Sequence, residues 1–284
     1  MTDHHLPLRD AVVLGAGGLL GRHLIEELAA RGVPTRAYDR ARCPIDDPAK
    51  VAATLIAATH VFNCAAWTDV DGAERQVDAA YRANALGAEI VAQAAAATGA
   101  VVVHVSTDFV FDGLLPRAYD EFDAPNPQSI YARSKRAGEL LVAQVARHHV
   151  VRVQGLYGRG GKNFASRLPD LLRSGKPLTI DGERRVQPTS ARAAARALLA
   201  IAQSPHFGTW HAACSGETTW AGFTARLAER LSLPVTWTAV ASSSLRLPAP
   251  RPPNCTLEQR RIQLYGLAPL PPWEAAQDGF LDEL

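Results

Sequence analysis

The sequence predicts an α/β protein with a Rossmann-type, doubly wound parallel sheet and a smaller carboxyl-terminal substrate lobe. Short apolar runs alternate with helical patterns over the first half of the chain, and a glycine-rich turn joins the first run to the first helical pattern. The 284 residues, 47% hydrophobic and 20% charged, are enough for one large core with a smaller lobe beside it.

The first apolar run, AVVL, leads straight into a glycine turn and a helical pattern that ends at Gly32. Backbone N–H groups of such a turn, together with the helix dipole, form a nest that can receive a pyrophosphate. The spacing of Gly15, Gly18 and Gly21 fits the G-x-x-G-x-x-G variant of short-chain reductases, because position 20 is a leucine. The dinucleotide contacts expected from this turn are Gly15, Gly17, Gly18, Leu19, Leu20 and Gly21.

The second apolar run ends in an acid and a base. Asp39 lies about 20 residues after the glycines, where a carboxylate would bind a ribose 2′-hydroxyl and favour NADH. Arg40 beside it could instead bind a 2′-phosphate, so NADPH and NADH both stay open. Asp46 and Asp47 precede Pro48 in a pattern typical of a helix start, and Asp46 is also a candidate for a place near the adenine.

The third run, VFNCAA, ends in small residues that would let a ribose and a nicotinamide lie against the backbone. Ala65, Ala66 and Thr68 are therefore expected at the cofactor, although helix packing would explain the alanines equally well. Asn84 lies in a helical stretch over 81–97. Its side chain is expected either to be satisfied locally or to belong to a proton relay.

The fourth run, VVVHV, is expected to be a buried parallel strand that brings Ser106 and Thr107 to the carboxyl edge of the sheet, where such sheets carry their chemistry. The pattern later becomes helical, and Tyr131 and Lys135 then share one helix face. The ammonium group would lower the pKa of Tyr131 from about 10, while Thr107 or Ser106 holds a carbonyl oxygen. With six tyrosines and four lysines, about 0.1 pairs at this spacing are expected by chance.

The composition argues against several other classes. A formal charge of +2, with most arginines scattered singly, disfavours a nucleic-acid surface. The four cysteines are far apart and the histidines have no metal-ligand spacing, so we expect reduced thiols in a cytoplasmic protein and no metal. No signal peptide and no apolar run long enough to span a bilayer is visible, so no membrane association is expected.

Five motifs, taken in order, resemble one family. They are the glycine turn, NCAAWTDVD at 63–71, STDFVFDG at 106–113, Tyr131-x-x-x-Lys135 followed by Gly138-Glu139, and RPPNCTL at 251–257. Together they closely resemble the dTDP-4-dehydrorhamnose reductases, extended short-chain dehydrogenases/reductases, over about residues 10–275. The resemblance implies a catalytic triad of Thr107, Tyr131 and Lys135, with Asn84 as a supporting member.

The resemblance also implies a reaction, the reduction of a 4-keto carbon on a nucleotide-linked 6-deoxysugar, dTDP-linked, with NADPH or NADH. Tyr131 would donate the proton, Thr107 would orient the oxygen and Lys135 would hold the ribose. A homodimer is compatible with the family. Arginine forks suit the diphosphate of such a substrate. The residues expected at the substrate are Val70, Asp108, Phe109, Asn163, Arg184 and Arg251.

The chain departs from the family pattern where an aromatic residue often lines the sugar pocket, because it has Gln154 and Gly155 there. The exact sugar therefore stays open. An epimerase or dehydratase of the same superfamily is an alternative, although Asp108 is followed by Phe109 and not by the glutamate expected of a 4,6-dehydratase. A second alternative is a non-catalytic relative that uses the nucleotide fold for regulation.

After Gly155 the regular alternation of strands and helices is lost. We expect residues 1–154 to form an NAD(P)-binding Rossmann domain, joined by returning segments of the second half, and residues 155–284 to form the smaller lobe over the site. Helices are expected near 164–175, 191–202 and 220–231, with Trp220 and Trp273 packing the lobe.

Overall fold

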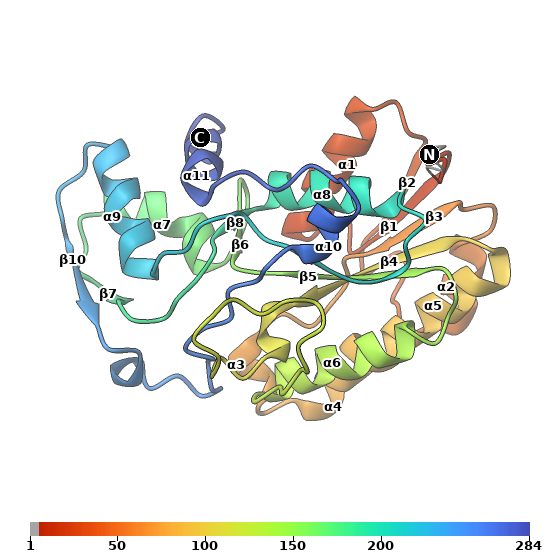
Figure 1. The fold of residues 1–284 in the computed structure, drawn as a ribbon, viewed down its shortest axis with the longest axis horizontal. Coiled ribbons are helices and arrows are strands. Elements are labelled where there is room, and N and C mark those ends of the chain that lie inside the picture. Colours follow the sequence, from red (N-terminus) through yellow and green to blue (C-terminus); the bar gives the residue numbers. More distant parts are fainter. Residues whose placement is uncertain (1–5) are drawn as a thin grey trace.

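The computed structural model describes residues 6–284, with one large parallel sheet and a smaller group of elements beside it (Figure 1). The sheet has the strand order β2-β1-β3-β4-β5-β9, and every neighbouring pair is parallel. The parallel sheet predicted from the sequence is therefore confirmed. The strands are β1 Ala11–Leu14, β2 Thr35–Tyr38, β3 His60–Asn63, β4 Val101–Thr107, β5 His148–Val153 and β9 Gly208–Ala212.

Helices cover both faces of the sheet. One face carries α1 (Leu19–Ala30) and α8 (Ala191–Ala202), and the other carries α2 (Pro48–Thr54), α5 (Gly87–Thr98) and α6 (Ile130–Val142). Successive side chains of a strand point to opposite faces, and both faces are buried here. Alternate residues of β1 and β4 accordingly belong to different cores, which is why these strands are continuous apolar runs in the sequence.

The site lies where the winding direction changes. From β1 the chain goes to β2 on one side and then crosses to β3 on the other, so the carboxyl ends of β1 and β3 face a common crevice. Gly15 follows β1 with a φ of +76°, and a Cβ there would lie 2.6 Å from the backbone nitrogen of Ala65. Only glycine lets the two strand ends approach this closely.

Asn84 lies in a helical segment that differs from the single helix expected over 81–97. It is divided into α4 (Val77–Tyr81), a π-helical turn over Arg82–Leu86, and α5. The backbone of Asn84 packs directly on α6, where a Cβ at Gly138 would lie 2.1 Å from the Asn84 carbonyl oxygen. This contact positions α6 against the turn, and π-helical turns of this kind are frequent near functional sites.

The smaller group contains two pairs of parallel strands, β6 (Leu156–Tyr157) with β8 (Thr189–Ser190) and β7 (Leu178–Asp181) with β10 (Trp237–Val240). The later segments α8 and β9 return to the large sheet. Division into two domains at residue 154 stays a prediction. The remaining helices are α3 Val70–Ala73, α7 Phe164–Arg173, α9 Trp220–Arg230, α10 Arg260–Leu264 and α11 Trp273–Leu281, with 3₁₀ turns at Asp108–Val110 and Ser242–Leu245.

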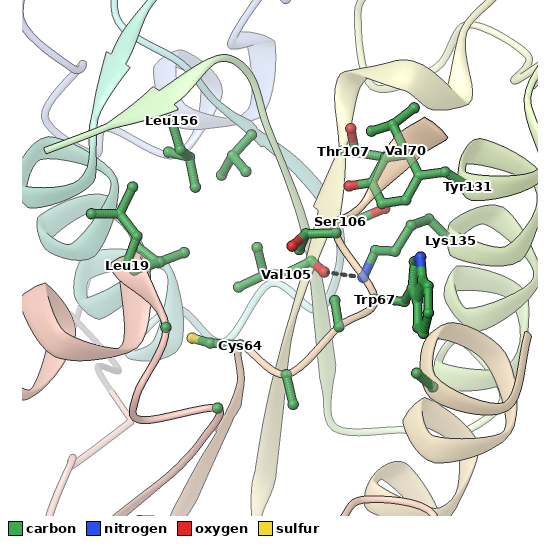
Figure 2. A pocket seen from close by; sticks show the side chains of 18 of the residues that line it. Leu19, Cys64, Trp67, Val70, Val105, Ser106, Thr107, Tyr131, Lys135 and Leu156 are labelled. Carbon is green, nitrogen blue, oxygen red and sulfur yellow. Dashed lines mark hydrogen bonds between the residues drawn. The ribbon is translucent and has the colours of Figure 1, made fainter. Parts of the chain in front are cut away.

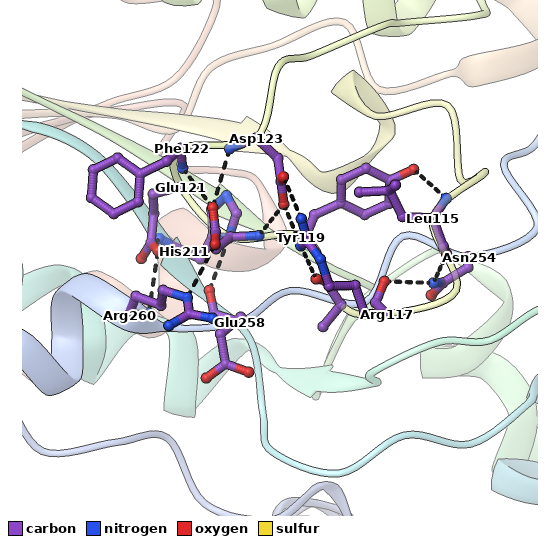
Figure 3. Close-up of polar contacts among 12 residues, drawn as sticks. Leu115, Arg117, Tyr119, Glu121, Phe122, Asp123, His211, Asn254, Glu258 and Arg260 are labelled. Carbon is purple, nitrogen blue, oxygen red and sulfur yellow. Dashed lines mark hydrogen bonds and ion pairs between the residues drawn. The ribbon is translucent and has the colours of Figure 1, made fainter.

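The connection between β4 and α6 is held by the carboxyl-terminal part of the chain (Figure 3). Tyr119 forms backbone hydrogen bonds of 2.8 Å with both Thr256 and Glu258. The amide of Asn254 donates to the carbonyl oxygen of Arg117 at 3.0 Å. A connection fastened in this way fixes the start of α6 relative to the end of β4. Within residues 6–284 we find no helix with both the length and the apolar character needed to cross a bilayer.

Candidate active site

The carboxyl ends of the strands open into a cavity of about 1010 Å³, which runs from the glycine turn to the smaller lobe. Two expected site residues, Asn84 and Arg251, do not line it. All the others do: Gly15, Gly17, Gly18, Leu19, Leu20, Gly21, Asp39, Arg40, Asp46, Ala65, Ala66, Thr68, Val70, Ser106, Thr107, Asp108, Phe109, Tyr131, Lys135, Asn163 and Arg184. Residues far apart in the sequence thus meet in one cavity.

Asn84 and Arg251 are engaged elsewhere. Asn84 accepts a hydrogen bond from the backbone of Trp67 at 2.8 Å and donates one to the Ser134 hydroxyl at 2.9 Å, so its polar groups are satisfied locally. Arg251 donates to the carboxylate of Asp71 at 2.8 Å. Asn84 thus holds Trp67, which lines the cavity, and a direct contact of Asn84 or Arg251 with a ligand stays a prediction.

The glycine turn presents an open helix end to the cavity. Gly18 is the N-cap of α1 and supplies no side-chain hydrogen bond, whereas Ser129 caps α6 and Ser190 caps α8 with their hydroxyls. Uncapped N–H groups and the positive end of the helix dipole suit a phosphate. A Cβ at Gly21 would lie 2.4 Å from the Gly15 carbonyl oxygen, so a side chain is excluded at position 21, where α1 packs on the turn. These features fit a dinucleotide diphosphate.

Asp39 and Arg40 line the cavity at the end of β2. One carboxylate oxygen of Asp39 accepts a hydrogen bond from the Arg42 backbone at 3.0 Å, and the other has no partner among the described residues. Arg40 is exposed. The cavity wall therefore carries both an acceptor for a ribose 2′-hydroxyl, the Asp39 carboxylate, and a cation for a 2′-phosphate, Arg40. Asp47, and not Asp46, caps α2, which leaves Asp46 on the cavity wall.

Tyr131, Thr107 and Lys135 converge at the ends of β4 and α6 (Figure 2). In this view the Thr107 hydroxyl lies beside the Tyr131 ring, and the Lys135 side chain extends toward β4. Lys135 is 2% exposed, and its Nζ donates to the Val105 carbonyl oxygen at 2.7 Å. Because Ser129 caps α6, Tyr131 stands in the first turn of the helix and Lys135 lies one turn later.

Burial controls the charge states of this group. It raises the pKa of Tyr131 to about 12, although the hydrogen bond with Thr107 acts against the shift, and the charge of Asp108 adds to it. Burial also lowers the pKa of Lys135 to about 8, against the charge of Glu139. The expectation of a lowered tyrosine pKa is therefore wrong for this structure, because burial disfavours the phenolate. Tyr131 keeps its proton at neutral pH, as a proton donor must.

Asp108 is a buried carboxyl group beside this triad. Its oxygens accept hydrogen bonds from the Gln154 amide at 2.9 Å and the Thr107 hydroxyl at 3.0 Å. Burial raises the pKa of Asp108 to about 7, against these hydrogen bonds and the charge of Arg184. Gln154 was not among the expected substrate-binding residues, although it stands where the family often has an aromatic residue in the sugar pocket. Its position directly after β5, at the same edge as Thr107, is the signal that could have identified it.

Two expected substrate residues line the cavity while making contacts within the protein. Asn163 caps α7 by accepting from the Ser166 backbone at 2.9 Å, and its amide donates to the Leu156 carbonyl oxygen at 2.7 Å. Arg184 pairs with Asp181 through Nε at 3.0 Å and Nη2 at 2.5 Å. Each is held in a defined position at the lobe side of the cavity.

Trp220 packs in the lobe as expected, and it also lines the cavity, a position that was not predicted from the sequence. Gly155 has a φ of +55°, and a Cβ there would lie 3.4 Å from Cη2 of Trp220. Gly155 therefore lies next to an indole that comes from α9. Trp273 is buried in a core that the lobe shares with one face of the large sheet, and its ring packs against Phe223 of α9, so its expected packing role is confirmed.

Comparisons with known proteins identify the family of this chain. The family model described as RmlD substrate binding domain matches residues 9–284. A dTDP-4-dehydrorhamnose reductase of Streptomyces griseus is 36% identical over 93% of this chain and 90% of its own, and that of Mycobacterium tuberculosis is 38% identical with the same coverage. The structure of the Bacillus anthracis dTDP-4-dehydrorhamnose reductase in complex with NADP is 30% identical, has a TM-score of 0.94, and is matched over 98% of this chain and 100% of that one. The chain therefore belongs to the dTDP-4-dehydrorhamnose reductase family of extended short-chain dehydrogenases/reductases.

Proposed function

We propose that this protein reduces the 4-keto group of a dTDP-linked 6-deoxysugar with NADPH or NADH. The observation that carries the proposal is the convergence of Thr107, Tyr131 and Lys135 in the same cavity as the glycine turn. The names of its relatives, dTDP-4-dehydrorhamnose reductases, support the substrate class. The cavity is large enough for a dinucleotide and a second ligand beside it.

The nicotinamide, when bound, supplies the hydride. The chain would hold the diphosphate at the glycine turn, where α1 begins, and the adenosine ribose at Asp39 or Arg40. Ala65 and Ala66 would offer a flat wall after β3. The role of the chain is to bind and orient the reactants and to exclude water around them.

Proton transfer falls to the triad. Tyr131 donates its phenolic proton to the substrate oxygen as negative charge develops there, because burial keeps the phenol protonated at neutral pH. The Thr107 hydroxyl orients the same oxygen. Lys135, one helix turn away, returns a proton to the tyrosinate and would hold the nicotinamide ribose. The product is a 4-hydroxyl sugar on the same nucleotide.

The substrate end of the cavity would receive the sugar nucleotide. Val70, Asp108 and Phe109 lie on its wall near the triad, and Arg184 and Asn163 lie on the lobe side. Arg184 would attract the diphosphate, although its pairing with Asp181 shares its charge. The proposal includes a cytoplasmic location, in keeping with four unpaired cysteines, and a homodimer as the assembly to be tested by sedimentation.

A test follows from the stoichiometry of the cofactor. The purified protein is incubated with NADPH or NADH and a panel of dTDP-, UDP- and GDP-linked 4-keto-6-deoxysugars, and the oxidised cofactor is compared with the sugar consumed. A reductase uses one reduced cofactor for each sugar. An epimerase or dehydratase regenerates its cofactor, so sugar conversion without net oxidation would refute the proposal. Tight NADPH binding with no oxidation by any sugar would favour a non-catalytic relative.

A further inference from the structure

Lys135 contacts a buried histidine that the proposed mechanism does not use. His104 lies on β4 with 0% exposure, and its Nε2 is 3.4 Å from Nζ of Lys135. Its other ring nitrogen, Nδ1, is 3.2 Å from the amide nitrogen of Asn63, the last residue of β3. Three polar side chains from two strands and one helix thus form a buried row beside the triad.

The orientation of Asn63 determines the tautomer of this ring. The Ala65 backbone N–H donates to Oδ1 of Asn63 at 3.2 Å, so the NH₂ group of the amide faces His104. An amide nitrogen can only donate, and Nδ1 must therefore accept. In a neutral imidazole the proton then resides on Nε2. Burial, with the charge of Lys135, holds the pKa of His104 well below its ordinary value, so the ring stays neutral.

This tautomer directs an N–H group at Lys135. Nζ already donates to the Val105 carbonyl oxygen at 2.7 Å. A neutral amine has a lone pair that can accept a hydrogen bond from Nε2–H of His104. An ammonium group has no lone pair, so its N–H groups would face the N–H of the ring with no acceptor between them. The arrangement therefore favours the neutral amine, in the same direction as burial does.

The other groups that face Lys135 act differently. Glu139, one turn further along α6, favours the ammonium form, but its charge is shared with Arg152 and Arg136 at 2.7–2.9 Å. Burial raises the pKa of the Cys64 thiol to about 12, so it is uncharged at neutral pH, as is the phenol of Tyr131. His104 is thus the group on β4 that opposes the ammonium form.

We infer that Asn63 and His104 are positioning residues for Lys135, which fix one imidazole tautomer and so keep the neutral amine accessible near neutral pH. In the proposed reaction, the ammonium group gives its proton to the tyrosinate and becomes an amine, which then accepts from Nε2–H. A proton from solution restores the ammonium group afterwards. The catalytic part of this inference rests on the proposed function, whereas the tautomer of His104 is independent of it.

The first test is ¹⁵N NMR of the histidine rings in the wild-type, full-length protein, with the His104 signals assigned by a His104→Gln variant. We expect a neutral ring with the proton on Nε2 at neutral pH. A proton on Nδ1, or a cationic ring, would overturn the inference. This measurement requires no sugar nucleotide, so failure of the proposed function would leave its result intact.

The second test reverses the tautomer. In Asn63→Asp the carboxylate accepts from Nδ1–H, which turns Nε2 into an acceptor for the ammonium group. We expect the titration of Lys135 Nζ, and the alkaline limb of the rate profile in a working assay, to move to higher pH by about one unit. An unchanged titration would contradict the inference.

A double variant separates the ring from the added charge. In Asn63→Asp with His104→Phe the carboxylate remains but the ring nitrogens are gone, and most of the shift should disappear. An equal shift with and without the ring would mean that charge alone causes it and would overturn the inference. Should Asn63→Asp fail to fold, His104→Gln is compared with His104→Phe. The glutamine amide can keep an N–H donor toward Nζ of Lys135, whereas phenylalanine cannot. Only His104→Phe should therefore move the titration of Lys135, and an equal effect of both variants would overturn the inference.

Discussion

Glu139 and Arg152 form a bidentate ion pair inside the protein, with Nε–Oε1 and Nη2–Oε2 distances of 2.9 Å. Glu139 is 1% exposed and Arg152 is 2% exposed. The pair joins α6, which carries Tyr131 and Lys135, to β5 of the central sheet. Burial alone would raise the pKa of Glu139, but the hydrogen bonds and charge of Arg152 outweigh it and hold the pKa below its ordinary value.

Removal of one partner should therefore destabilise the fold. We expect Glu139→Gln to lower the free energy of unfolding by about 3 kcal/mol, because the Arg152 charge is left buried without a counter-charge. Urea unfolding followed by circular dichroism measures the change. The matched control is Asp170→Asn, which removes the partner of Arg173 in an exposed pair at 3.7 Å and should change stability by less than about 0.5 kcal/mol. Equal effects of the two substitutions would show that the buried pair has no special role.

The same pair predicts a pH dependence of stability. A carboxyl group with a lowered pKa in the folded state stabilises the fold above its unfolded pKa of about 4.3, and this contribution is lost as the pH falls through the folded value. The stability difference between the wild type and Glu139→Gln should thus be largest at neutral pH and shrink in acid. Urea midpoints measured from pH 7 to pH 3 test this, and a difference that is constant over the range would contradict it.

Tyr131→Phe should lower turnover by a factor on the order of 10² or more, as expected for loss of a general acid. Cofactor binding, measured by fluorescence titration with NADPH, should stay within about twofold of the wild type, because the ring and its packing are kept. Tyr119→Phe removes a hydroxyl that donates to Asp112 outside the cavity, and serves as the control. Turnover that survives in Tyr131→Phe would remove this residue from the mechanism.

The cofactor preference should depend on Asp39 and Arg40. Removing the carboxylate in Asp39→Ala takes away repulsion of a 2′-phosphate, so the ratio of kcat/KM for NADPH to that for NADH should rise. Arg40→Ala should lower the same ratio, because a cation near the phosphate is lost. Steady-state kinetics with both cofactors measure the two ratios. Variants that shift the ratio in the same direction, or not at all, would place the discrimination elsewhere.

Trp220 offers a test of the substrate end of the cavity. Trp220→Ala should raise the KM of the sugar nucleotide by about tenfold or more while leaving the cofactor Kd within twofold, since the indole lines only the lobe side. Trp237→Ala on β10, outside the cavity lining, controls for loss of lobe packing. A larger effect on cofactor binding than on sugar binding would contradict the assignment.

Local patterns allowed much of this protein to be predicted. The glycine turn, the strand before it and the helix that carries Tyr131 depend on neighbours in the sequence, because backbone conformation and helix formation are decided within a few residues. The residues at the strand ends could also be placed, because the residues that directly follow parallel strands all lie at the same edge of the sheet. Ser106 and Thr107 were placed in this way, Tyr131 and Lys135 were paired by their spacing on one helix face, and the resemblance to the family implied the triad with Thr107.

Other features depend on contacts between distant segments. The engagement of Arg251 by Asp71, the arrival of Trp220 beside Gly155 and the contact of Lys135 with His104 join residues that no local pattern relates. The pKa of Tyr131 was misjudged for the same reason, because the cost of burying a charge depends on everything packed around it.

The sequence by itself determined the fold class, the family and the chemical groups at the strand ends, because these follow from short-range spacing along the chain. Only the tertiary structure decided which charges are buried, which side chains pair and which tautomer Asn63 imposes on its neighbour, since burial and hydrogen bonding are properties of the packed whole.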